Sequence, residues 1–449
     1  MQKFIRRLVL IIIGYFWGVA FKIESKMKGC FDEIIGYENQ KLDLAEVIQL
    51  LKSRSTSNGR LKQRVPKGIL IDGPKGTGKT LIAKAFIAES KLPFIIISGS
   101  EINSAKDVKH LFLAARVKES SIIFIDEFDV IGKESKDNER IIAQLAFEMN
   151  KRDHVLVVAT TRNVNEISYS LKRPGRFEVV ISMLLPDLSE RMQIIEYCGN
   201  KKRIDSSVSI EKLAQRLTGI STLEIMQIMN KAIKIAEQNH HKNVMIEDFS
   251  YAQMEYEQSV SHNLKRTINE LKMTAYHEAG HAVCAFLSHS KRIREVSIIP
   301  TQSSFGHVAT YTLDEYGKIT KQDLETEIMI SLAGRAAEEL FFNSPTSGAK
   351  GDIEKTAKFV KQYLTEFCFD EKIGIAPVSR LSVEQLSGTD LNNQLLNRSV
   401  EIMNLFYERT KEYLKQNQKL LEEIVKVLLH KKVLFEEEVY AIYNKYNFK

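Results

Sequence analysis

The sequence predicts an α/β domain followed by a short helical region, then a mainly α-helical domain, with one apolar helix at the N-terminus. Three observations predict this arrangement. Fully apolar strands alternate with helical stretches between residues 65 and 187, as in a parallel sheet covered by helices. Helical spacing dominates residues 188–256 and the stretch from Leu395 onward. The first thirty residues contain one long apolar run.

Length and composition are those of a multidomain globular protein. The chain has 449 residues, of which 44% are hydrophobic and 27% are charged. At roughly 150 residues per domain, this length predicts about three domains. The net charge of +7 is small for the length, so we expect no nucleic acid among the partners. The four cysteines form no CxxC pair, which excludes a cysteine zinc site and favours reduced thiols.

The N-terminal apolar run extends from Leu8 to Phe21 and has basic residues on both sides. As a helix it would rise about 21 Å, short of a hydrocarbon core of about 30 Å. The longer stretch from Phe4 to Ile23 would cross if its flanking basic side chains reached the interfaces. A single transmembrane helix is therefore favoured. A cleaved signal peptide ending near Ala20 and an interfacial or buried helix are the alternatives.

The α/β region contains a phosphate-binding loop in its required context. A strand pattern ending at Asp72 leads into GPKGTGKT, and a helical stretch follows. The glycines let backbone N–H groups close around phosphates, Lys79 can reach the β- and γ-phosphates, and the Thr80 hydroxyl can bind Mg²⁺. The residues expected to contact the nucleotide here are Gly73, Pro74, Lys75, Gly76, Thr77, Gly78, Lys79, Thr80 and Leu81.

Two further strands end in polar residues. The first ends in Asp126 and Glu127, which suit the magnesium shell and the polarisation of the attacking water. A later strand ends near Thr161. Beyond it, Arg173 and Arg176 flank a Pro-Gly turn, where they suit donation to the γ-phosphate of a neighbouring subunit. Taken alone, that turn could equally be a solvated basic loop.

The order and spacing of these motifs resemble the AAA+ ATPases, so the α/β region is expected to be a P-loop AAA+ domain. The resemblance implies that Ile35 and Gly36, in FDEIIG, contact the adenine through their backbone. It also places Arg173 and Arg176 at the arginine-finger positions and Thr161 at the position of a polar sensor. Residues from Leu188 to about Tyr256 match the helical lid.

The C-terminal half contains a second chemical motif, HExxH, at His277 to His281. On a helix the two histidines are four residues apart, so both rings can face one metal ion. Glu278 then stands beside the metal as the general base for a water molecule. A zinc site of this kind needs a third protein ligand. The residues alone leave five candidates, namely His289, His307, Glu338, Glu339 and Asp352.

The surrounding motifs resemble the FtsH family of membrane-bound, ATP-dependent zinc metalloproteases. They are TAYHEAGHA, then IIP at 298–300, LAGRAAEEL at 332–340 and GAKGDI at 348–353. The resemblance implies a zinc metallopeptidase domain in which Asp352 is the third ligand. Glu338 and Glu339 are then expected to form salt bridges or to support the ligands. It also implies Zn²⁺, ATP and Mg²⁺ as cofactors and polypeptides as substrates. The protein is then expected to form a homo-oligomer, a hexamer, at the cytoplasmic face of the plasma membrane.

These interpretations divide the chain into four segments. We predict a membrane anchor and linker at 1–30, a P-loop AAA+ domain at 31–187, a helical lid at 188–258 and a zinc metallopeptidase domain at 259–449. The anchor would be single-pass, in contact with membrane lipid, with the catalytic domains in the cytoplasm.

The sequence departs from the family pattern at four points. One candidate span replaces two spans around an extracytoplasmic domain. The segment after Ser100 is short and has no aromatic residue, although the family places there a loop that grips the threaded polypeptide. Thr161 stands where the family has Asn, and the lid reads TGISTLE where the family has a Gly-Ala-Asp element.

Three functions are compatible with these features. The first is an ATP-dependent zinc endopeptidase at the membrane surface. The second is an ATP-binding interaction subunit that joins full-length relatives in mixed rings and alters their activity. The third is a peptidase that acts only on unfolded chains because the aromatic pore loop is missing. All groups needed for the first function are present, so it is the one predicted.

Overall fold

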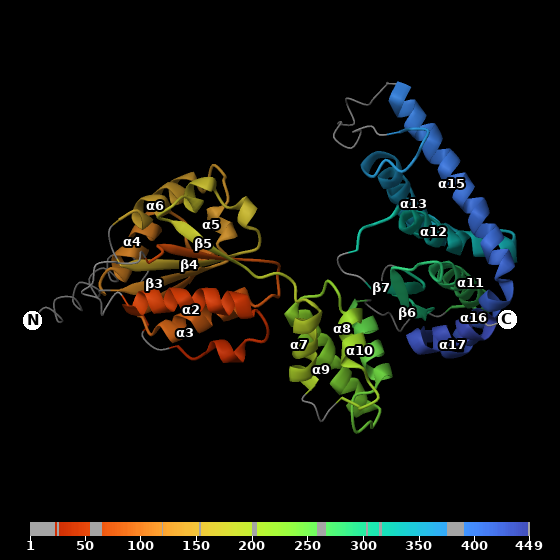
Figure 1. Ribbon diagram of the computed structural model, residues 1–449, viewed down its shortest axis with the longest axis horizontal. Coiled ribbons are helices and arrows are strands. Elements are labelled where there is room, and N and C mark those ends of the chain that lie inside the picture. The colour runs from red at the N-terminus through yellow and green to blue at the C-terminus, as the bar shows by residue number, and fades with distance from the viewer. Residues whose placement is uncertain are drawn as a thin grey trace, which may run out of the picture. The chain divides into compact units, whose positions relative to one another are not determined.

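The structure is a computed structural model, shown in Figure 1, in which the chain divides into two compact units. The first unit contains the described residues below 202 together with 219–227, and the second contains those at 202–218 and from 228 onward. No helix in the described part of the chain is long and apolar enough to cross a membrane. The predicted anchor from Leu8 to Phe21 lies outside it. The structure describes residues 23–24, 27–53, 65–118, 120–151, 154–199, 204–257, 266–301, 304–313, 317–374 and 390–447.

The first unit is built on a five-stranded sheet in the order β2-β3-β4-β1-β5. All four strand pairs are parallel, as the unbroken apolar runs predict for strands buried on both faces. The carboxyl ends of β1, β3 and β4 therefore meet at one edge of the sheet, where ligands bind in such folds. The strands are β1 (Gly68–Asp72), β2 (Phe94–Ser98), β3 (Ser121–Asp126), β4 (Val155–Thr161) and β5 (Phe177–Ser182).

Helices cover both faces of this sheet (Figure 1). Successive side chains of one strand point to opposite faces, so Ile69 and Ile71 pack with α2 and α3, while Leu70 packs with α4 and α6. Each face thus has its own apolar core. The helices are α2 (Glu38–Ser53), α3 (Lys79–Ser90), α4 (Ala105–Ala115), α5 (Asp129–Gly132) and α6 (Glu139–Met149).

Four helices follow β5, in the region predicted to be the lid. Their division between the units is uneven: α7 belongs to the first unit, α8 and α10 belong to the second, and α9 crosses from one to the other near Gln227. The four are α7 (Leu188–Gly199), α8 (Ile210–Arg216), α9 (Thr222–Gln238) and α10 (Ile246–Glu257).

The rest of the second unit is mainly helical, as predicted, around an antiparallel sheet in the order β7-β6-β8. Its helices are α11 (Ile268–Ala285), α12 (Lys321–Phe342), α13 (Lys350–Lys361), the π-turn η6 (Gln362–Glu366), α15 (Asp390–Gln416), α16 (Gln418–Lys431) and α17 (Glu436–Asn447). Its strands are β6 (Lys291–Ser297), β7 (His307–Thr312) and β8 (Val433–Phe435).

Helices α11 and α12 form the centre of this unit, and local sequence fixes where they begin. Thr267 and Glu270 form a reciprocal capping box at the start of α11. Gly280 lets the two helices approach closely, since a Cβ there would lie 2.6 Å from the carbonyl oxygen of Ala333. The glycine that costs helix stability in the HExxH segment therefore serves helix packing.

Candidate active sites

The predicted metal ligands come together from two helices. His277 and His281 lie on α11, and Asp352 lies in the first turn of α13. The Nε2 atoms of the histidines are 3.1 Å apart, and the Oδ2 atom of Asp352 lies 3.1 Å from His277 Nε2 and 3.3 Å from His281 Nε2. In a tetrahedron with bonds of about 2.0–2.1 Å, ligand atoms are separated by about 3.3 Å. The three atoms therefore fit one zinc ion.

Helix α12 fixes the orientation of both histidine rings. His277 Nδ1 lies 2.7 Å from Glu338 Oε1, and His281 Nδ1 donates to the carbonyl oxygen of Ile330 at 2.6 Å. Because Nδ1 is engaged in each ring, Nε2 is left to face the metal position. Glu338 is held in turn by the backbone N–H of Thr346, which donates to Oε2 at 2.5 Å.

The charges at this centre are strongly coupled. Burial lowers the pKa of His277, but the hydrogen bonds to Asp352 and Glu338 outweigh it and raise that pKa to about 10. Burial raises the pKa of Asp352, yet His277 and His281 hold it below its ordinary value. A zinc ion at Nε2 of His277 would displace the proton that faces Asp352, while Nδ1 would still donate to Glu338.

Glu278, the predicted general base, lies beside the histidines and is only 5% exposed. Burial raises its pKa, while positive charge on His277 and His281 lowers it. The backbone of Gly306 packs directly against its carboxylate, since a Cβ at Gly306 would lie 2.7 Å from Oε1. A carboxylate with a raised pKa beside a metal position is suited to accept a proton from water near neutral pH.

The phosphate-binding loop follows β1 and has the backbone that its glycines predict. Gly73, Gly76 and Gly78 all have positive φ, at 150°, 85° and 89°. The Nζ atom of Lys79 donates to the carbonyl oxygens of Gly73 and Pro74 at 2.7 and 2.6 Å. Burial lowers the pKa of Lys79. Phosphate oxygens would replace these carbonyls as acceptors for the ammonium group.

The magnesium position lies where β1 and β3 end. The Thr80 hydroxyl donates to both carboxylate oxygens of Asp126 at 3.1 Å. Glu127 is exposed and has a positive φ of 52°, and its Oε1 atom lies 3.9 Å from Nη2 of Arg162. The structure brings together Lys79, Thr80 and Asp126, the groups that the sequence assigns to phosphate and Mg²⁺.

Thr161 and its neighbour Thr160 differ in their contacts. The Thr160 hydroxyl contacts Asp126 and accepts from the backbone N–H of Glu127 at 3.1 Å. Thr161 is buried, and its hydroxyl accepts from the backbone N–H of Asn163 at 3.4 Å. The direct contact with the acidic pair thus comes from Thr160, a residue that the sequence analysis did not select.

The predicted adenine contacts precede α2. Ile35 is partly buried and Gly36 is buried with a φ of 72°. The next backbone N–H, that of Tyr37, donates to Glu190 Oε1 at 2.9 Å, which ties this segment to α7. Within the first unit, the backbone N–H of Leu223 donates to the carbonyl oxygen of Gly76 at 3.1 Å. The start of α9 therefore contacts the phosphate-binding loop, although its sequence TGISTLE lacks the Gly-Ala-Asp element of the family.

The two predicted arginine fingers have different surroundings. Arg173 is exposed, and its guanidinium lies 5.5 Å from the centre of the Tyr169 ring. Arg176 is partly buried and donates to the carbonyl oxygen of Ser170. Arg173 is therefore the freer of the two to reach a neighbouring subunit.

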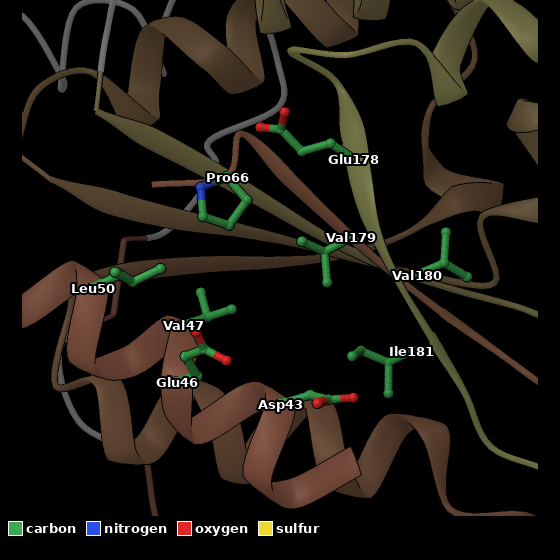
Figure 2. Close-up of a pocket in the computed structure, with 9 residues that line it drawn as sticks. All are labelled: Asp43, Glu46, Val47, Leu50, Pro66, Glu178, Val179, Val180 and Ile181. Carbon is green, nitrogen blue, oxygen red and sulfur yellow. The ribbon is translucent and has the colours of Figure 1, made fainter. Parts of the chain in front are cut away.

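A separate pocket lies between α2 and β5 and has a volume of about 370 Å³ (Figure 2). None of its lining residues belongs to the predicted sites. Glu178 at its rim accepts from the backbone N–H groups of Lys67 and Gly175, so it supports the turn between the two arginines. The pocket is lined by Asp43, Glu46, Val47, Leu50, Pro66, Glu178, Val179, Val180 and Ile181.

Comparison with known proteins matches each half of the chain to a family. The model of the ATPase family associated with various cellular activities (AAA) matches residues 69–185, and that of peptidase family M41 matches residues 264–442. ATP-dependent zinc metalloprotease FtsH 3 of Symbiobacterium thermophilum is 31% identical over 93% of this chain and 71% of its own length. The chain belongs to the FtsH family. The FtsH proteins of Cyanidium caldarium and Pseudothermotoga lettingae are 31% and 32% identical, over 94% and 92% of this chain and 73% and 70% of theirs.

The connection between β2 and α4 is short and differs from the FtsH pattern. After β2 the chain makes a short 3₁₀ turn, Gly99–Glu101, and Ser104 then caps α4 through the backbone N–H of Asp107. Ile102, the only apolar residue in this connection, is 3% exposed and packs in the core. It is therefore not available to grip a polypeptide, and no aromatic residue replaces it.

Further residues support the candidate metal site. Glu338 and Glu339 are predicted to form salt bridges or to support the ligands; Glu338 contacts His277, while Glu339 pairs with Tyr407 and Lys411. Gly334 is not among the residues selected from the sequence, and a Cβ there would lie 2.5 Å from both His277 Nε2 and His281 Nε2. A glycine one α-helical turn before Glu338 was the available signal.

Proposed function

We propose that this protein is an ATP-dependent zinc endopeptidase that degrades proteins at the cytoplasmic face of a membrane. The observation that carries this proposal is the triangle of His277, His281 and Asp352, with the buried carboxylate of Glu278 beside it. Three protein ligands and one adjacent carboxylate are the set that a catalytic zinc site requires. Family membership supports the same reaction.

The residues of this chain would share the work at the peptide bond. A zinc ion held by the three ligands supplies a Lewis acid that activates water and polarises the peptide carbonyl. Glu278 accepts the proton from the attacking water and can pass it to the leaving amine. Glu338 and the carbonyl of Ile330 hold the imidazoles in the tautomer that keeps Nε2 free for the metal.

The nucleotide site would supply the energy for substrate handling. The phosphate-binding loop and Lys79 are suited to hold the triphosphate, Thr80 and Asp126 to hold Mg²⁺, and Glu127 to polarise water. Ile35 and Gly36 would contact the adenine, and Thr161 would act as the sensor. Exposed Arg173, with Arg176 beside it, would complete the site of a neighbouring subunit. This arrangement requires a homo-oligomer, and a hexamer is the form that we propose.

We also propose that the N-terminal apolar run anchors the protein in the plasma membrane as a single span. The run and its basic flanks support this proposal. The domains that use ATP would then lie in the cytoplasm. An interaction subunit that only modulates relatives is not favoured, because every catalytic group of both sites is present.

The test is hydrolysis of unfolded casein by the purified, zinc-loaded protein with ATP. We expect fragments from the wild type, and about a thousandfold slower cleavage by Glu278→Gln, since a positioned general base contributes roughly 10²–10⁴ in rate. The variant should retain its zinc and its ATP hydrolysis. A wild type that leaves casein intact, or a variant that cleaves as fast as the wild type, would overturn the proposal.

A further inference from the structure

A bulge in β6 creates a buried ion pair beside the peptidase site. Ile293 pairs with Thr310 and Glu295 pairs with Ala309, so Arg294 is an extra residue in the strand. Neighbours in a regular strand point to opposite faces, but the bulge turns both charged side chains to one side. The Arg294 guanidinium contacts Glu295 through Nε–Oε2 at 2.7 Å and Nη2–Oε1 at 2.9 Å.

This pair is removed from water, yet it remains fully charged. The side chains of Arg294 and Glu295 are 5% and 0% exposed. Burial raises the pKa of Glu295, but Arg294 and His307 outweigh it and hold that pKa at about 2. A buried ion pair contributes little net stability, whereas it fixes the geometry of the groups around it. The role of this ion pair therefore follows from the groups that it holds in position rather than from its contribution to stability.

On one side, the pair reaches the lid. Glu257, the last residue of α10, accepts two hydrogen bonds from Arg294, through Nη1–Oε1 at 2.8 Å and Nη2–Oε2 at 2.6 Å. Gln253 links the same carboxylate to the carbonyl oxygen of Arg216 at the end of α8. The bidentate geometry restricts both the distance and the angle between α10 and β6.

A second buried contact holds the same helices on the same sheet. The Arg216 guanidinium is 1% exposed and donates to Glu436 Oε2 from Nη2 at 2.8 Å. Glu436 Oε1 also accepts from Arg292 at 2.9 Å and from Tyr311 at 3.0 Å, in β6 and β7. The lid helices α8 and α10 are thus joined to the sheet at two charged points within the second unit.

On the other side, the pair reaches the start of β7. His307 Nε2 lies 3.4 Å from Glu295 Oε1, and within the described residues neither buried ring nitrogen of His307 makes a hydrogen bond. The residue before it, Gly306, is the one whose backbone packs against the carboxylate of Glu278. The contact between Glu295 and His307 therefore lies one residue from the contact that confines the general base.

We propose that Arg294, Glu295 and His307 are positioning residues for Glu278, and that Glu257 ties this position to the lid. The inference rests on the proposed peptidase function and deepens it. Because the start of α9 contacts the phosphate-binding loop, a nucleotide-dependent movement of the lid helices would pass through Glu257 and Arg294 to β7 and the base. The rate of peptide hydrolysis then depends on nucleotide even for a substrate that needs no unfolding.

The experiment uses the full-length protein and a short fluorogenic peptide, with ATP, with ADP and without nucleotide. Glu257→Gln should lower kcat by about tenfold with little change in KM, because small misplacements of a catalytic group cost one to two orders of magnitude. It should also abolish the difference between the nucleotide states. Glu257→Asp should recover part of both effects, and His307→Leu should lower kcat in the same way.

Glu255→Gln is the matched control. Glu255 lies two residues earlier on α10 and pairs with Lys231 at 2.9 Å, within the lid. Zinc content and ATP hydrolysis, measured on every variant, report that each one folds. If Glu257→Gln behaves as Glu255→Gln does, or if it changes only KM, the inference is overturned while the peptidase function stands. If the wild type cleaves no peptide, both are overturned.

Discussion

The nucleotide site and the metal centre are built on opposite principles. In the first, nine consecutive residues would supply most of the proposed contacts, chiefly through backbone N–H groups of glycine-rich chain. In the second, side chains from α11 and α13 converge, and two groups on α12 hold them in place. The first site therefore depends on backbone conformation, and the second depends on the packing of helices.

Because the nucleotide site depends on backbone conformation, the largest selective loss of ATP binding is expected from a substitution at one of its glycines. Gly73 has a φ of 150°, and a Cβ there would lie 2.0 Å from the carbonyl oxygen of Met183. Gly73→Ala should weaken ATP binding by at least about a hundredfold, because the loop must move away from the phosphates. Titration with a fluorescent ATP analogue measures this loss, and zinc content should not change.

Gly351→Ala is the control in the other site. Gly351 lies in α13 beside the proposed ligand Asp352, and a Cβ there would meet no atom within 4 Å. Zinc affinity and ATP affinity should both stay within about twofold of the wild type. A loss of zinc from Gly351→Ala, or normal ATP binding by Gly73→Ala, would contradict the contrast between the two sites.

The metal centre should instead be sensitive to residues that never touch the metal. Glu338→Gln removes the carboxylate that orients His277, so zinc affinity should fall about 10–100-fold while ATP binding is kept. Competition with a chelator of known affinity measures the change. Glu339→Gln is the neighbouring control, because Glu339 contacts Tyr407 and Lys411 instead. Equal zinc loss from both variants would show that helix packing, rather than the contact with His277, was disturbed.

The pH dependence of metal binding sharpens the same comparison. The pKa of His277 is raised to about 10, so without zinc this ring keeps its proton at pH 7, and zinc must displace it. Zinc affinity should therefore rise by about tenfold per pH unit for each displaced proton between pH 7 and pH 9. Calorimetry in buffers of different ionisation enthalpy counts the protons. Release of no proton would contradict the proposed pairing of His277 with Asp352 and Glu338.

The sequence predicts the geometry of a site best where the functional residues lie close together along the chain. The glycines of the loop and the pair of His277 and His281 could be assigned because their spacing alone fixes their geometry. Asp352 is 75 residues from His277, so the residues left it among five candidates until the family resemblance selected it. The parallel sheet and the helical second half followed from hydrophobic patterning in the same way.

The contacts that were missed depend on how separate elements pack. Nothing in the local sequence shows that Glu338 rather than Glu339 faces His277, because this depends on the rotation of α12 against α11. The link between Glu257 and Arg294 depends on a β-bulge at Arg294, and the local sequence contains no glycine or proline that would predict this bulge. The burial of Ile102 likewise follows from how the short connection after β2 meets the core.

We propose that ATP hydrolysis at the first site drives protein degradation at the second. The most direct test measures ATP hydrolysis and degradation of a folded, tagged protein together, for the wild type, Glu278→Gln and Glu127→Gln. We predict that the wild type does both, that Glu278→Gln hydrolyses ATP without degrading the substrate, and that Glu127→Gln does neither. Two results would contradict this coupling. In one, Glu127→Gln degrades the folded substrate at the wild-type rate. In the other, the wild type degrades unfolded casein but not the folded substrate.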